Sequence, residues 1–154
     1  MSVAPAGATI QMASGTCPET SSLHIPISLT IDGQGTAANP VILDGQSTDT
    51  IADVSLSSAT VTMDNLTISR GGSPFGEAVF NNGTVTLAND AFAAGQRALF
   101  NNGTATMTDV TVTGNSASVD GPAMFNSGIA YVIDSTISAN STGGDGGPSS
   151  TAGP

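Results

Sequence analysis

A repeated phrase between Ala78 and Asn140 is the feature of this sequence that most restricts its fold. Three segments match one another, and they are 78–87 (AVFNNGTVTL), 98–107 (ALFNNGTATM) and 123–132 (AMFNSGIAYV). Their phenylalanines, Phe80, Phe100 and Phe125, set steps of 20 and 25 residues. A step of this length is typical of solenoids, in which each repeat forms one coil stacked on the next.

Each copy also contains the strand and turn pattern of a β-solenoid coil. Val85 and Leu87 alternate with Thr84 and Thr86, as in a strand with one buried face. Two more short apolar segments follow in each coil, separated by Gly, Asn or Asp, which favour tight bends. No segment has enough helical periodicity for the crossover helices of a βαβ fold. The sequence therefore predicts an all-β parallel β-helix of about six coils over residues 1–140 and a flexible Gly/Ser/Pro-rich tail over residues 141–154.

Equivalent residues of successive coils are expected to stack in ladders, about 4.7–4.8 Å apart. We expect the ladder of Phe80, Phe100 and Phe125 to lie inside the solenoid. Two further inward ladders are predicted: Val61, Val85, Ala105 and Ala130, and Met63, Leu87, Met107 and Val132. Polar ladders are predicted at two corners: Asn65, Asn89, Asp109 and Asp134, and Asn81, Asn101 and Asn126. Turns select Asn and Asp, and stacked amides hydrogen-bond along the column, so the simplest interpretation of both polar ladders is structural.

Charge and composition exclude several classes of partner. The 154-residue chain has a net charge of −10, and Arg70 and Arg97 are its only fixed cations, so nucleic-acid binding by phosphate neutralisation is excluded. The same charge disfavours anionic membranes, and no run of about 18 apolar residues is present for membrane insertion. Aromatic residues make up 4% of the chain, which suits the thin aliphatic core of a solenoid. Cys17 is the only cysteine, so no internal disulfide is expected.

Three phrases resemble the repeats of a known group of proteins. They are SLTIDGQG at 28–35, FNNGTVTL at 80–87 and DSTISAN at 134–140. They are similar to repeats of right-handed parallel β-helix proteins of the pectate-lyase-like group, above all to bacterial proteins with polymorphic-outer-membrane-type repeats. The resemblance covers roughly residues 8–140 and implies a right-handed coil and a secreted or cell-surface location. It selects no single function, because this group includes adhesins, lyases, hydrolases and phage spikes.

The first two candidate functions need no catalysis. One is an adhesin-like or structural scaffold, which suits a surface that is acidic and rich in Ser, Thr and Asn. The other is binding of ice or carbohydrate by two outward columns of threonine: Thr60, Thr62, Thr84, Thr86, Thr104 and Thr106. β-Branched threonine is stiff, so the array would be flat and preordered, and it resembles the faces of β-solenoid antifreeze proteins. Threonine is also a common outward strand residue, and Ile129 and Tyr131 interrupt the array in the next coil.

The third candidate function is a polysaccharide lyase or hydrolase. The resemblance implies that a lyase would combine calcium-binding acids with an Arg or Lys base, whereas a hydrolase would use paired carboxylates. The candidate catalytic residues are Arg70, Glu77, Arg97 and Asp120, which we expect at the same corner of variable length. Glu77 and Arg97 have a simpler interpretation as an ion pair on the surface.

Cofactors and partners are only weakly indicated. Asp-Gly pairs at 32–33 and 44–45 raise the possibility of calcium, but the alternating acids of a calcium loop are missing, so the expectation is no cofactor. His24 is the only histidine and is expected to be packed or at the surface rather than a metal ligand. The last coil, Tyr131–Ile137, lacks a polar cap. We expect its end to be covered by the folded-back tail, by another copy or by a further domain.

Overall fold

The computed structural model describes residues 4–72, 77–118, 121–143 and 149–151, and all of its strands lie in parallel sheets stacked as a solenoid of about five turns. Sheet A contains β1 (Ala8–Met12), β4 (Leu29–Gly33), β7 (Thr60–Asp64), β10 (Thr84–Ala88), β13 (Thr104–Thr108) and β17 (Ile129–Ile133). Sheet B contains β2 (Gly15–Pro18), β5 (Val41–Asp44), β8 (Thr67–Ser69), β11 (Ala91–Ala93), β14 (Thr111–Thr113) and β18 (Thr136–Ser138). Sheet C contains β3 (Leu23–His24), β6 (Ala52–Val54), β9 (Glu77–Asn81), β12 (Arg97–Asn101), β16 (Met124–Asn126) and β20 (Ser149–Thr151).

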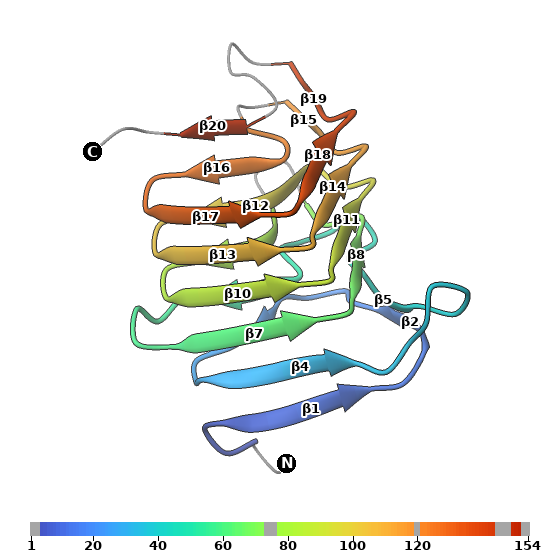
Figure 1. The fold of residues 1–154 in the computed structure, drawn as a ribbon, viewed down its shortest axis with the longest axis vertical. Helices are drawn as coiled ribbons and strands as arrows, with labels where there is room; N and C mark the ends of the chain where they lie inside the picture. The colour runs from blue at the N-terminus through green and yellow to red at the C-terminus, as the bar shows by residue number, and fades with distance from the viewer. Residues whose placement is uncertain (1–3, 73–76, 119–120, 144–148, 152–154) are drawn as a thin grey trace.

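Each coil supplies one strand to each sheet, and the chain rises from the N-terminus to the C-terminus as a right-handed coil (Figure 1). A small fourth sheet joins β15 (Ser116–Ala117) to β19 (Ser141–Thr142). None of the described residues forms a helix. The prediction of an all-β, right-handed parallel β-helix is therefore confirmed. Within the segment predicted as a tail, β19 pairs with β15 and β20 pairs with β16.

The aliphatic ladders predicted from the repeat line the interior of sheet A. Val61, Val85, Ala105 and Ala130 are register partners in successive strands, and so are Met63, Leu87, Met107 and Val132. Val85 and Leu87 are completely buried, because the side chains of sheets B and C close the triangular section around them. Such a thin core buries each side chain against its own coil and the two neighbouring coils.

The phenylalanine ladder exists, but the prediction that it lies inside is wrong. Phe80, Phe100 and Phe125 are register partners, yet they are only partly buried, whereas Val79 and Leu99 before the first two are fully buried. Alternation along the strand then directs the residue after each phenylalanine inward. These strands bury an asparagine and place the larger phenylalanine on the outer face.

Buried asparagines form a continuous amide ladder at the end of sheet C. Asn81 Nδ2 donates to Asn101 Oδ1 at 2.7 Å, and Asn101 Nδ2 donates to Asn126 Oδ1 at 2.6 Å. The same amides also donate to backbone carbonyls, for example Asn101 Nδ2 to Ile129 O at 2.9 Å. Asn81 and Asn101 have no solvent exposure, and this burial is stable because the amide groups have partners. The predicted alignment is confirmed.

Two corner columns flank sheet B in the left-handed backbone conformation. The first comprises Asn65, Asn89, Asp109 and Asp134, with φ between +47° and +58°. The second comprises Arg70, Ala94, Gly114 and Ala139, with φ between +51° and +65°. The predicted alignment of the first column is confirmed, and its residue types suit it, since Asn and Asp tolerate this conformation better than most residues. Only one position in the second column holds glycine.

Candidate functional site

The outer face of sheet A carries the threonine columns predicted from the sequence. Thr60, Thr84 and Thr104 are register partners, and so are Thr62, Thr86 and Thr106. All six are solvent-accessible, because the alternating residues of the same strands fill the core. We call this surface, together with the two threonines described next, the threonine face.

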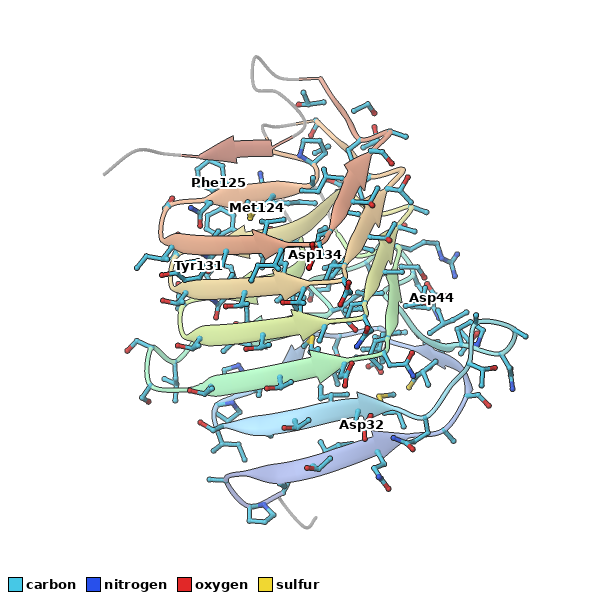
Figure 2. The ribbon with its side chains drawn as sticks, in the orientation of Figure 1. Asp32, Asp44, Met124, Phe125, Tyr131 and Asp134 are labelled. Carbon is cyan, nitrogen blue, oxygen red and sulfur yellow. The ribbon has the colours of Figure 1, made fainter. Side chains whose placement is uncertain are left out.

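Two threonines missed by the sequence reasoning extend the second column. Thr30 pairs with Thr62, and Thr9 pairs with Thr30, so five threonines follow one another in successive coils. The signal was available as Ala8-Thr-Ile and Leu29-Thr-Ile, but these strands lie outside the repeated phrase. Tyr131 ends the column in the sixth strand, where its side chain points away from the solenoid (Figure 2).

A third column of residues borders the threonine face, and along the solenoid axis its residues change from polar and acidic to small and uncharged. It begins with Gln11, Asp32 and Asp64 and continues with Ala88 and Thr108. Asp32 lies at the end of β4 beside the face (Figure 2). Asn89 Nδ2 donates to Asp64 Oδ1 at 2.9 Å. The N-terminal half of the face is therefore bordered by hydrogen-bond acceptors, and the C-terminal half by small uncharged groups.

Two of the four predicted catalytic residues meet on sheet C. Arg97 and Glu77 are register partners in β12 and β9, and Arg97 Nη1 lies 3.5 Å from Glu77 Oε2. Their exposed fractions are 8% and 6%, so the expectation of an ion pair on the surface is wrong. Burial raises the pKa of Glu77 to about 7, although the Arg97 guanidinium acts in the opposite direction. A buried pair of this kind positions its partners rather than leaving them free for a substrate.

Arg70 does not belong to that pair. Its guanidinium forms a two-point contact with the Asp44 carboxylate, with Nε donating to Oδ1 at 2.8 Å and Nη2 donating to Oδ2. The Arg70 hydrogen bond lowers the pKa of Asp44. This contact joins the end of β5 to the corner after β8, one coil further on. Asp120, the fourth predicted residue, lies outside the described residues.

The phenylalanine ladder and Arg97 form one packed group on the outer face of sheet C. The ring centroids of Phe80 and Phe100 are 5.5 Å apart, and those of Phe100 and Phe125 are 5.0 Å apart. The Arg97 Cζ lies 5.2 Å from the Phe100 centroid and 5.5 Å from the Phe125 centroid. The stacked rings and the cation–π contacts hold the Arg97 side chain against Phe100 in its own coil and Phe125 in the next coil. The ladder is therefore a structural support of sheet C.

The remaining titratable candidates are dispersed. His24 Nδ1 lies 3.1 Å from Asp53 Oδ2 at the exposed start of sheet C, and the Cys17 thiol donates to Glu19 Oε1 at 3.2 Å. The Glu19 hydrogen bond and burial raise the pKa of Cys17. No group of three or more His, Cys, Asp or Glu side chains within the described ranges could hold a metal ion.

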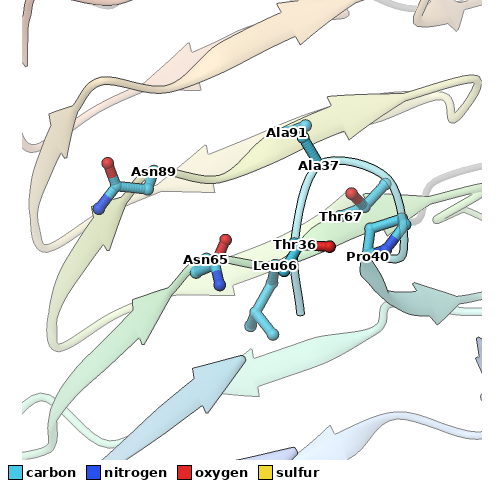
Figure 3. Close-up of a pocket in the computed structure, with 8 residues that line it drawn as sticks. All are labelled: Thr36, Ala37, Pro40, Asn65, Leu66, Thr67, Asn89 and Ala91. Atoms are coloured by element: carbon cyan, nitrogen blue, oxygen red, sulfur yellow. The ribbon is translucent and has the colours of Figure 1, made fainter. Parts of the chain in front are cut away.

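A shallow pocket of about 290 Å³ opens where the 34–40 loop covers the corner between sheets A and B. The loop passes across β8 and β11 and brings Ala37 next to Ala91, with Asn65 and Asn89 at the side (Figure 3). Its eight lining residues are Thr36, Ala37, Pro40, Asn65, Leu66, Thr67, Asn89 and Ala91. None of the eight carries a charge, so the pocket offers no acid or base for chemistry.

One buried carboxylate was missed entirely by the sequence reasoning. Asp90 occupies a core corner position that Leu66 and Val110 fill in the neighbouring coils, and it is 2% exposed. Its Oδ1 accepts the Leu66 N–H at 2.9 Å, whereas its Oδ2 has no hydrogen-bond partner. Burial raises the pKa of Asp90 to about 7. The sequence shows Asn-Asp at 89–90 only as a turn, and nothing in it indicates which of the two residues is buried.

Comparisons with known proteins add no further constraint. No protein-family model, no curated protein sequence and no solved structure matches this chain. Within the described part of the chain, no helix is long and apolar enough to cross a membrane.

Proposed function

We propose that this chain is a non-catalytic, adhesin-like β-solenoid that is secreted or displayed on a cell surface and binds carbohydrate through the threonine face. The observation that supports this function is the register of the threonine columns, which repeats the same hydroxyl in five successive coils. The repeats that resemble pectate-lyase-like and polymorphic-outer-membrane-type proteins agree with such a location and role.

The chemistry of the face fits a polyhydroxylated chain lying along the solenoid axis. A threonine hydroxyl both donates and accepts, so each coil offers one contact to a sugar hydroxyl. Asp32 and Asp64 border Thr30 and Thr62 in register, and they add charged acceptors. The net charge of −10 repels polyuronates, so the expected ligand is a neutral polysaccharide.

Affinity electrophoresis through gels containing neutral polysaccharides tests this proposal, with a glycan array as the wider screen. We expect retardation of the parent chain and a loss of at least about tenfold in affinity for a Thr86→Tyr, Thr106→Tyr double variant, because two bulky rings interrupt the flat column. The matched control is Thr111→Tyr, Thr136→Tyr, which changes two adjacent exposed threonines on sheet B. Equal loss in both variants, or no binding by the parent, would refute the proposal.

Ice is the second candidate ligand, and the C-terminal half of the threonine face favours it. There the two threonine columns run side by side, and Ala88 and Thr108 border them without a charge. Stiff β-branched side chains on a twisted but regular sheet form a preordered array of methyl and hydroxyl groups. Thermal hysteresis in the parent chain that disappears in the Thr86→Tyr, Thr106→Tyr variant, together with no retardation of the parent chain by polysaccharide, would identify ice rather than carbohydrate as the ligand.

Polysaccharide cleavage is not the function that we propose. Arg70 and Arg97 are each engaged by a carboxylate, and both Arg97 and Glu77 are covered. A substrate would have to break one of these ion pairs before it reached a base. Formation of new reducing ends or unsaturated products from a bound polysaccharide would contradict this assignment.

A further inference from the structure

The 34–40 loop is an insertion at the corner between sheets A and B. Seven residues join β4 to β5, whereas two residues turn the same corner in the other coils, at 13–14, 65–66, 89–90, 109–110 and 134–135. The loop adds little to the core, because all of its residues except Gly35 and Pro40 are exposed. A solenoid can lengthen such a corner without disturbing its core, and binding loops are commonly formed there.

Hydrogen bonds hold this exposed loop in one conformation. Thr36 and Asn39 pair through two backbone hydrogen bonds of 3.0 Å, and Asn39 Nδ2 donates to Ser14 Oγ at 2.8 Å. From the following coil, Asn65 Nδ2 donates to Gly33 O at 2.6 Å, at the base of the loop. Ordering an exposed loop costs conformational entropy, and this loop buries little apolar surface to offset that cost. A fixed loop on the surface of a rigid scaffold is typical of a binding site.

The pocket beneath the loop offers both kinds of surface that a sugar ring requires. Ala37 and Ala91 supply apolar contacts for the C–H groups of a ring (Figure 3). Asn89 donates through Nδ2 to Asp64, which leaves its Oδ1 as an acceptor, and the Thr67 hydroxyl has no hydrogen-bond partner within the described residues. A volume of about 290 Å³ is at the lower end for small-molecule sites, so the pocket suits one ring rather than a chain.

The pocket also lies beside the threonine face. Asn89 directly follows β10 and is three residues beyond Thr86, which is about 10 Å along an extended strand. In this coil the bordering column contributes only Ala88, whose methyl group is too small to separate the face from the pocket. A polysaccharide lying on the threonine column can therefore place a branch of one sugar in the pocket.

We propose that this pocket is a subsite for one neutral sugar ring, carried as a branch on the polysaccharide that lies along the threonine face. The subsite rests on the proposed function and narrows its ligand to a branched neutral polysaccharide. An anionic ring is disfavoured by the net charge of −10 and by Asp64, which contacts the lining residue Asn89. A purely apolar ligand is disfavoured as well, because it would leave the amide and hydroxyl groups of the lining without partners.

Methyl NMR spectroscopy of the parent chain with isotope-labelled alanine tests the pocket directly. Titration with D-glucose, D-galactose and D-mannose should shift the Ala37 and Ala91 signals with at least one of these sugars, with a dissociation constant of about 1–10 mM for so small a ligand. Ala91→Phe fills the pocket and should abolish the Ala37 shift. Ala93→Phe is the matched control, because it lies on the same face of β11 but outside the pocket, and it should preserve the shift.

A milder variant separates sugar binding from blockage of the pocket. Thr67→Val keeps the shape of the side chain and removes its hydroxyl, so it should weaken sugar binding about three- to tenfold. No shift of Ala37 and Ala91 with any of the three sugars, or the same Ala37 shift in Ala91→Phe as in Ala93→Phe, would overturn the subsite.

The glycan array distinguishes the branch from the threonine face. Because a linked second contact multiplies the affinity of the first, Ala91→Phe should lower the signals of branched neutral glycans by at least about tenfold and leave linear neutral glycans unchanged. Parent binding confined to linear glycans, or equal loss of both classes in Ala91→Phe, would reject the branch and leave carbohydrate binding by the threonine face intact. Sugar-induced shifts at Ala37 in a parent chain that binds no glycan on the array would refute the proposed function and, with it, the branch.

Discussion

Substitution of Asp90 by asparagine should stabilise this protein at neutral and alkaline pH. The carboxylate is buried among the corner residues of sheets A and B, and one of its oxygens has no hydrogen-bond partner. An asparagine keeps the acceptor for the Leu66 N–H and removes the buried charge. The substitution also changes the volume of the side chain very little, so the surrounding ladder stays packed.

The magnitude follows from the pKa. Burial raises the pKa of Asp90 from 3.8 to about 7, and at 1.36 kcal/mol per pKa unit the ionised form is disfavoured in the folded state by about 4 kcal/mol. The folded state holds the proton more tightly, so this stabilisation is complete below about pH 4 and is lost as the pH rises to about 7. The new Nδ2 group of asparagine lacks an acceptor, which costs about 1–3 kcal/mol. We therefore expect a net gain of about 1–3 kcal/mol at pH 8 and a net loss of about 1–3 kcal/mol at pH 4, where Asp90 is protonated and only the cost of the unpaired Nδ2 group remains.

Urea unfolding followed by circular dichroism from pH 4 to pH 8 measures both quantities. The Asp90→Asn variant should lose much of the decline in unfolding free energy between pH 4 and pH 7. A residual decline is expected from Glu77, whose pKa is also raised to about 7. Asp109→Asn is the matched control, because it removes the same charge from an exposed corner residue one coil further on. An Asp90→Asn variant that keeps the full pH dependence, or is less stable than the parent at pH 8, would refute the reasoning.

Three further predictions concern stability and are checked by the same unfolding measurements. Ala94→Gly should stabilise the folded state by about 0.5 kcal/mol. Glycine removes the strain energy of an alanine at a φ of +55°, and this gain slightly exceeds the free-energy cost of the conformational entropy that glycine adds to the unfolded chain. A clear destabilisation would contradict this account of the corner. Asn101→Ala should destabilise by about 3 kcal/mol, since it removes both amide–amide hydrogen bonds of the buried ladder and leaves a cavity, whereas Asn102→Ala in the exposed neighbouring column should cost about 0.5 kcal/mol; equal effects would show that burial of the ladder is unimportant. Gly103→Ala should destabilise by about 3 kcal/mol, because the new Cβ would lie 2.0 Å from Gly83 O. Gly114→Ala should cost only about 1 kcal/mol, because its φ of +65° is unfavourable for alanine but no atom lies near its Cβ position. A larger loss for Gly114→Ala than for Gly103→Ala would reject the steric explanation.

The repeated phrase was sufficient to predict the coil and its register. Because side chains alternate along a strand, fixing Val85 and Leu87 inward also fixes Thr84 and Thr86 outward, and the structure agrees. The same logic aligned Asn101 with Asn81 one coil earlier. Repetition helps here because each aligned position is observed several times, which averages out the ambiguity of any single short strand.

Hydrophobicity alone gave the wrong face for Phe100. The sequence reasoning assumed that the larger apolar residue must be buried, but Asn101 satisfies its amide within the ladder and with backbone carbonyls, so its burial is not penalised. The pairing of Arg70 with Asp44 was missed because it joins strands 26 residues apart that share no repeated phrase. Asp90 was missed because a turn sequence does not reveal which side chain enters the core.

The asparagine ladder gives the solenoid an internal direction. Each amide donates to the coil that follows it, from Asn81 to Asn101 to Asn126, and none of these links runs the other way. Turning one amide around would set its oxygen against the next oxygen and its nitrogen against the preceding nitrogen, so the three groups can reverse only as a unit. Aligned amides also polarise one another, which strengthens each link when the next one forms. The coils are thus linked by a chain of amides that has a donor end and an acceptor end. The two ends of the solenoid therefore differ in hydrogen-bond polarity as well as in the direction of the backbone.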